Sequence, residues 1–205
     1  MWQTLRSAWS GRIDASQGNL NPSFRYLRLV VEGQTVLLAL GYTDAHPQGP
    51  IEVWYSANKE VLRIQNGRIV GAAGTVTEWR SVQATFLPNW SSVAKASIPL
   101  RWTRTRDVMP GYRYGVKDIV ITRAVTPPVR SQLIGLDPAS LAWFEEESTG
   151  LYKVKDKVDE LPVARYAVAL SQGAEVVMYS EQCLATDLCF SMQRWPVPSS
   201  AGITR

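Results

Sequence analysis

The residues best suited to chemistry gather in one short stretch, in which arginines alternate with aromatic and hydroxyl side chains. The run from 100 to 106 reads LRWTRTR, and Tyr112, Arg113 and Tyr114 follow a Met-Pro-Gly turn. Guanidinium groups bind carboxylates or phosphates through paired N–H donors, and they also stack on aromatic rings. This stretch is therefore a candidate binding surface for an anionic polymer such as an acidic polysaccharide.

Strand geometry decides which of these side chains share a face. Because side chains alternate along a strand, Arg101 is expected on one face and Trp102, Arg104 and Arg106 on the other. The candidate ligand-binding residues are Arg101, Trp102, Arg104, Arg106, Tyr112, Arg113 and Tyr114. An alternative is a polar outer strand face on which the arginines pair with Asp107 and Asp118.

Carboxylate chemistry is suggested only by Glu145, Glu146 and Glu147. A glycosidase needs two carboxyl groups that flank one bond, whereas neighbours on a helix point about 100° apart. We therefore interpret the three glutamates as a solvated charge run. The single histidine, His46, lies in a proline-rich loop and is interpreted as a solvated loop residue. The sequence contains no nucleophile-elbow, zinc-protease or phosphate-loop motif, so it predicts no catalytic residue, cofactor or metal site.

The surrounding segments predict strands joined by hairpins. Residues 24–41 form a hairpin around Glu32-Gly33, and residues 51–74 form a meander whose second turn is Asn66-Gly67. Further strands are expected at 75–86, 100–106, 116–123, 151–158, 163–170, 175–180 and 190–197. Sequential hairpins without intervening helices predict an all-β antiparallel meander, closed as a barrel or folded into two packed sheets. We expect one domain that spans residues 1–205.

Two helices are expected in addition to the strands. Trp2, Leu5 and Trp9 are spaced as on a short amphipathic N-terminal helix. Residues 136–150 predict an internal helix, since an Asp-Pro start signal precedes apolar residues and a glycine ends the segment. Residues 88–99, between two prolines, are expected to be a loop.

Composition limits the classes of partner. The chain has 205 residues, of which 45% are hydrophobic, enough to bury a sizeable core. Its 22 basic and 18 acidic residues give a net charge of +4, which is too balanced to require nucleic acid. No run approaches the roughly 20 apolar residues of a membrane-spanning helix. A mildly basic surface suits acidic sugars or phospholipid head groups.

Three segments of the sequence resemble the YjbF/GfcB family of bacterial outer-membrane lipoproteins, which are encoded beside exopolysaccharide and group 4 capsule export genes. They are YLRLVVEGQTVLLALGY at 26–42, WYSANKEVLRIQNGRIVGAAG at 54–74 with WRSV at 79–82, and YSEQCLATDLCFSMQRWPV at 179–197. The resemblance implies an all-β fold anchored to the periplasmic face of the outer membrane by an acylated cysteine. That cysteine and its signal peptide are not in this sequence, so we interpret Met1 as an artificial start.

The resemblance implies a non-enzymatic accessory lipoprotein for exopolysaccharide or capsule secretion. Its expected partners are an anionic polysaccharide, outer-membrane polysaccharide export proteins, or both, with the membrane reached through the N-terminal lipid and no role for nucleic acid. Two alternatives remain open. One is a carboxylate-dependent glycan-processing enzyme acting on the same polymer. The other is a docking module for an export porin, which would bind through an aromatic patch or a free sheet edge.

The resemblance also bears on Cys183 and Cys189, which lie six positions apart. In the oxidising periplasm that the resemblance implies, the two cysteines are expected to form a disulfide. In a reducing compartment they would instead be two small buried hydrophobic residues.

Overall fold

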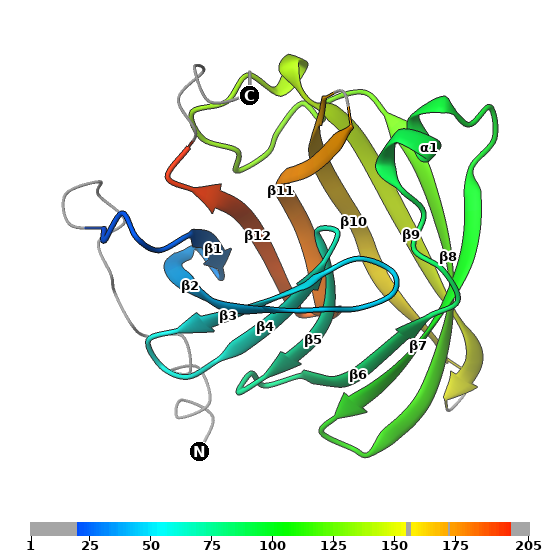
Figure 1. Cartoon of the computed structure of the whole chain (residues 1–205). Helices are drawn as coiled ribbons and strands as arrows, with labels where there is room; N and C mark the ends of the chain where they lie inside the picture. The colour runs from blue at the N-terminus through cyan, green and yellow to red at the C-terminus, as the bar shows by residue number, and fades with distance from the viewer. Residues whose placement is uncertain (1–19, 155–156, 172, 198–205) are drawn as a thin grey trace.

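Twelve antiparallel strands form one sheet that closes on itself as a barrel (Figure 1). The structure is a computed structural model that describes residues 20–154, 157–171 and 173–197. Each strand pairs with its neighbours in sequence, and β1 also pairs with β12, which closes the ring. The all-β prediction is confirmed, and of its two forms the barrel is the one observed.

The strands are β1 (Tyr26–Val31), β2 (Gln34–Asp44), β3 (Ile51–Ser56), β4 (Val61–Gln65), β5 (Arg68–Ala73), β6 (Glu78–Ala84), β7 (Leu100–Met109), β8 (Arg113–Val125), β9 (Ala142–Val154), β10 (Lys157–Ser171), β11 (Ala174–Ala185) and β12 (Leu188–Trp195). The helical elements among the described residues are α1 (Trp90–Lys95) and the short 3₁₀ helix η1 (Pro138–Ser140). The expected N-terminal helix lies outside the described residues.

Two tight turns, one between β1 and β2 and one between β4 and β5, lie where the sequence predicts them. Asn66 and Gly67 have φ of 47° and 79°, and the Glu32-Gly33 pair has φ of 49° and 75°. Positive φ at both central residues is typical of a type I′ hairpin turn. Gly67 is required for a second reason, since a Cβ there would lie 2.4 Å from a methyl carbon of Val177.

The predicted internal helix at 136–150 is wrong. Asp137 does accept the N–H of Ala139 at 3.0 Å, but the helix that it caps is only η1, and β9 follows. The apolar residues are buried on opposite faces of β9: Phe144 packs with Trp90 and Tyr166, whereas Trp143 packs with Tyr179 in a separate cluster. An apolar run that is covered on both faces is typical of a buried strand, which explains the resemblance to a helical pattern.

Residues 88–99 were expected to be a loop, yet they contain α1, which lies at the barrel rim in Figure 1. Its Trp90 is fully buried, with ring centroids 5.0 Å from Phe144 and 4.7 Å from Tyr166. The side chain of the N-cap residue forms no capping hydrogen bond. Instead, the carboxylate of Glu175 on β11 accepts the backbone N–H groups of Trp90 and Ser91 at 2.8 and 2.9 Å.

Cys183 and Cys189 face each other across β11 and β12 and form a disulfide. We expect the variant with both cysteines changed to alanine to lose about 2 kcal/mol of unfolding free energy, because the bridge restricts the unfolded chain over a short loop. Urea unfolding of the oxidised protein and the variant measures the difference. Reductant should weaken the unaltered protein and leave the variant unchanged; equal stability of the two oxidised proteins would contradict the prediction.

Candidate binding site: an arginine-lined opening in the barrel wall

The barrel wall separates between β5 and β6. Within the described residues these two strands share one registered pair, Ala72 with Trp79, whereas every other pair of neighbouring strands shares at least five. A cavity of about 580 Å³ occupies the opening. Its lining includes His46, Arg63, Arg68, Arg80, Trp102 and Arg104.

The loop at residues 45–50 crosses the opening from β2 toward β6 (Figure 1). Gln48 Nε2 donates to the carbonyl of Ala84, at the end of β6, at 3.2 Å. Gln65 on β4 holds the loop from beneath, since its Nε2 lies 2.7 Å from the carbonyl of Gly49 and 2.9 Å from His46 Nδ1. The predicted loop is therefore one wall of the cavity, and His46 contributes a hydrogen bond there.

The charged side chains of the described lining are all basic. Four arginines and no described aspartate or glutamate belong to it. The two outer arginines have partners behind them: Arg63 lies 2.9 Å from Asp44, and Arg80 lies 2.6 Å from Glu78. Their side chains are 43% and 59% exposed, so these ion pairs are worth about 1 kcal/mol or less each. Both guanidinium groups can therefore serve an anionic ligand as well.

The two inner arginines of β7 share one buried carboxylate. Asp118 accepts Arg104 Nε at 2.7 Å and Arg106 Nε at 2.6 Å, and its side chain is 1% exposed. Both guanidinium carbons also lie within 5 Å of the Trp79 ring centroid. Burial by itself raises the pKa of Asp118, but the hydrogen bonds and charges of the two arginines outweigh it and hold the pKa below its ordinary value.

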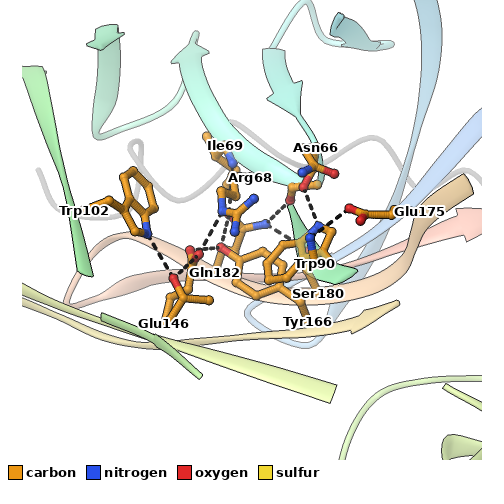
Figure 2. Close-up of polar contacts among 12 residues, drawn as sticks. Asn66, Arg68, Ile69, Trp90, Trp102, Glu146, Tyr166, Glu175, Ser180 and Gln182 are labelled. Atoms are coloured by element: carbon orange, nitrogen blue, oxygen red, sulfur yellow. Dashed lines mark hydrogen bonds and ion pairs between the residues drawn. The ribbon is translucent and has the colours of Figure 1, made fainter. Parts of the chain in front are cut away.

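A second buried network surrounds Arg68 (Figure 2). Arg68 Nε donates to Glu146 Oε1 at 2.8 Å, and its guanidinium carbon lies 3.8 Å from the Trp90 ring centroid. The same Glu146 oxygen accepts the hydroxyl of Thr122 at 2.9 Å, and that hydroxyl accepts Trp102 Nε1 at 2.9 Å. The network thus joins β5, β7, β8 and β9 across the barrel interior.

Tyr166 on β10 completes this network. Its hydroxyl donates to Glu146 Oε2 at 3.0 Å and lies 3.2 Å from Gln182 Oε1. Burial first, and the charge of Glu146 second, raise the pKa of Tyr166 well above its ordinary value. The phenol therefore remains a neutral hydrogen-bond donor at physiological pH.

The candidate residues of β7 and β8 are not all brought together. Trp102, Arg104 and Arg106 share the inward face, as the alternation predicts, and the first two line the cavity. Arg101 is exposed outside the barrel, and Arg113 is half-buried near the turn. Tyr112 and Tyr114 are 71% and 67% exposed at the turn between β7 and β8. The predicted binding surface is thus divided between the interior and the turn.

The interpretation of the glutamates as a solvated run is wrong for one of the three. Because β9 is a strand, Glu146 points inward and is 4% exposed, while Glu145 and Glu147 point outward. The outward pair contacts Arg123 at 3.0 and 2.7 Å, and Glu145 also contacts Arg165 at 3.1 Å. The sequence did not indicate Arg63, Arg68 and Arg80 as site residues. Their only signal in the sequence is that each is an arginine within a predicted strand.

A larger cavity of about 870 Å³ lies at the rim beside α1. Two carboxylates line it, those of Glu52 and Glu175. Arg194 donates to both oxygens of Glu52, at 3.1 and 3.0 Å. Burial opposes ionisation of Glu175, but hydrogen bonds from Ser91 and Trp90 prevail and lower its pKa. Both carboxylates are therefore engaged in holding strands and α1 in place.

Two absences concern only the residues that the structure describes. Among them, no cluster of three or more histidine, cysteine, aspartate or glutamate side chains is arranged to hold a metal ion. None of their helices has the length and hydrophobicity needed to cross a membrane.

No protein-family model and no curated protein sequence matches this chain. Among solved structures, the chain is similar to the crystal structure of a hypothetical lipoprotein, YmcC, from Escherichia coli (K12). The two are 18% identical in sequence and superpose with a TM-score of 0.62, and the match covers 96% of each chain. This similarity establishes a shared fold over nearly the whole length.

Proposed function

We propose that this barrel is a non-enzymatic binding module that holds a segment of an acidic polysaccharide in the opening between β5 and β6. The observation that carries the proposal is the lining of that opening. Its guanidinium groups are complementary to sugar carboxylates. The loop at 45–50, which crosses the opening, would hold a chain between itself and the strands.

The biological setting is part of the same proposal. The resemblance to the YjbF/GfcB lipoproteins, together with the similarity to a structure described as a hypothetical lipoprotein, supports a lipid-anchored accessory role in exopolysaccharide or capsule secretion. The proposed location is the periplasmic face of the outer membrane, where export proteins would be neighbours. The disulfide between Cys183 and Cys189 agrees with an oxidising compartment.

The enzymatic alternative has less support from the geometry. A retaining or inverting glycosidase needs two carboxyl groups that flank a substrate bond at roughly 5 to 9.5 Å. The arginine-lined opening has no described carboxylate in its lining, and the two in the larger cavity are bound to Arg194 and to the start of α1. We therefore propose binding rather than catalysis.

Calorimetry with a uronic-acid polysaccharide tests the proposal, and the same polymer with its carboxyl groups reduced to alcohols is the matched control. We expect salt-sensitive heat with the acidic polymer alone, because the recognition is between charges. Changing Arg63 and Arg80 to alanine should weaken binding about tenfold, which corresponds to about 1.4 kcal/mol for two exposed charge contacts.

The control variant is Arg123→Ala, which removes an exposed arginine from the outer face of β8. It should bind like the unaltered protein. Equal binding heats with the acidic and the reduced polymer would contradict the proposed site. So would an equal loss of affinity in the variant without Arg63 and Arg80 and in Arg123→Ala. In cells, deletion of the gene should lower surface polysaccharide, and normal polysaccharide in the deletion strain would count against the export role.

A further inference from the structure

Arg68 is buried with four of its five N–H donors unpaired among the described residues. The residue is 3% exposed, and its Nε is engaged by Glu146. Within the part of the chain that the structure describes, its Nη1 and Nη2 are buried and have no hydrogen-bond partner. Leaving buried donors unpaired costs about 1–3 kcal/mol or more for a charged group. A bound ligand that accepts hydrogen bonds from Nη1 and Nη2 would remove this cost.

Arg68 lies beside the opening between β5 and β6. Arg68 and Trp102 both line that cavity, and the guanidinium carbon lies 5.7 Å from the Trp102 ring centroid. Glu146 and the ring of Trp90 fix the guanidinium plane from within (Figure 2). The remaining pair of amino groups presents the parallel donors that match the two oxygens of a carboxylate.

Buried ionic networks surround Arg68 and its neighbours on β7. The two networks contain the guanidinium groups of Arg68, Arg104 and Arg106 and the carboxylates of Asp118 and Glu146. A bound oxyanion would supply acceptors for the unpaired donors of Arg68.

We propose that Arg68 is the anchor of an oxyanion subsite at the inner end of the cavity, where its Nη1 and Nη2 bind the carboxylate of an acidic sugar residue. The subsite rests on the proposed function, since it names the group by which the polymer is recognised. A phosphate carried on a sugar has the same oxyanion chemistry, and the experiment distinguishes the two.

NMR of the arginine guanidinium groups in the full chain observes this subsite directly. Glucuronate, glucose and inorganic phosphate are titrated separately at equal ionic strength. We expect saturable shifts of the Arg68 resonances with glucuronate and none with glucose, while the Arg123 resonances on the outer face stay unchanged. Equal shifts with phosphate would overturn the assignment to a carboxylate, and no saturable shift with either anion would overturn the subsite.

Two variants keep the test independent of folding. Arg68→Lys retains a positive charge beside Glu146 but lacks the paired donors, so glucuronate affinity should fall about tenfold or more. The double variant Arg68→Met with Glu146→Gln removes both charges together and should abolish glucuronate binding, which calorimetry measures in both variants because neither has Arg68 resonances. Glucuronate binding of unaltered strength in either variant would overturn the proposal.

The two proposals can fail separately. If the polysaccharide binds in calorimetry while the Arg68 resonances do not move, the binding function stands and the subsite is wrong. If glucuronate moves the Arg68 resonances but the polymer does not bind, the subsite stands and the polymer-binding function is wrong.

Discussion

Replacing Asp118 with asparagine is expected to lower the unfolding free energy by about 3–5 kcal/mol. The buried carboxylate accepts two hydrogen bonds from Arg106 and one from Arg104 at 2.6 to 2.9 Å. An asparagine amide has one acceptor oxygen and presents its NH₂ group to a cation, so both arginines lose the negative charge of this carboxylate. Urea unfolding at neutral pH measures the loss.

Asp107→Asn is the matched control on the same strand. Asp107 is half-buried. Its carboxylate accepts the backbone N–H of the exposed Gly115 at 2.8 Å. We expect its replacement to cost less than about 1 kcal/mol, as is usual for surface substitutions. A similar small cost for Asp118→Asn would contradict the view that the two arginines depend on this carboxylate.

The Asp118 contribution should also depend on pH with a defined sign. Its pKa in the folded protein is lowered, against an unfolded value of about 3.9. The contribution is therefore fully present above about pH 4 and is lost as the pH falls through the lower folded pKa. The stability difference between the unaltered protein and Asp118→Asn should be constant from pH 7 to 5 and shrink only below about pH 4. A difference that already shrinks between pH 7 and 5 would refute the assignment.

Replacing Glu146 with glutamine is the second change with a large expected effect, about 3–5 kcal/mol. It removes the charge that pairs with Arg68, and it replaces one of the two oxygens that accept the hydroxyls of Thr122 (at Oε1) and Tyr166 (at Oε2) by an NH₂ group. Glu147→Gln, the next residue on the outer face, should cost less than about 1 kcal/mol because its partner Arg123 is 38% exposed. Urea unfolding of the two variants compares neighbouring glutamates that point in opposite directions.

A double-mutant cycle separates the ion pair from general damage to the core. Adding Arg68→Met to Glu146→Gln should restore part of the lost stability, because no uncompensated buried charge remains. We expect the two changes to differ from additivity by about 1–3 kcal/mol. Additive losses would show that Arg68 and Glu146 are not coupled, against the 2.8 Å contact between them.

The strand pattern and the tight turns could be predicted from the sequence because they depend on local chemistry. Asn66, Gly67 and Gly33 adopt positive φ, which only a few residue types do readily. The choice between a barrel and two packed sheets depends on the pairing of β1 with β12, which are far apart in sequence. No local pattern encodes that contact.

The error at 136–150 has a tertiary cause. Asp137 and Pro138 give a helix start signal, and the structure uses it for one short turn. The residues after it pair with β8 on one side and β10 on the other, and this pairing satisfies their backbone groups as a strand. Propensity and capping are weak compared with such contacts on both sides.

The candidate site was predictable only in part. Period-two alternation correctly places Trp102, Arg104 and Arg106 on one face, but it does not say whether that face is inside or outside. Arg68 resembles any arginine on a strand, because its burial depends on Trp90 from α1 and Glu146 from β9. The separation of β5 from β6 is likewise a property of the closed barrel.

A crystal structure of the protein with an acidic oligosaccharide tests the central claim most directly. We expect sugar density between β5 and β6, beneath the loop at 45–50, with a carboxylate within hydrogen-bonding distance of the Arg68 amino groups. Density over the exposed Tyr112 and Tyr114 instead, with the opening unchanged, would contradict it.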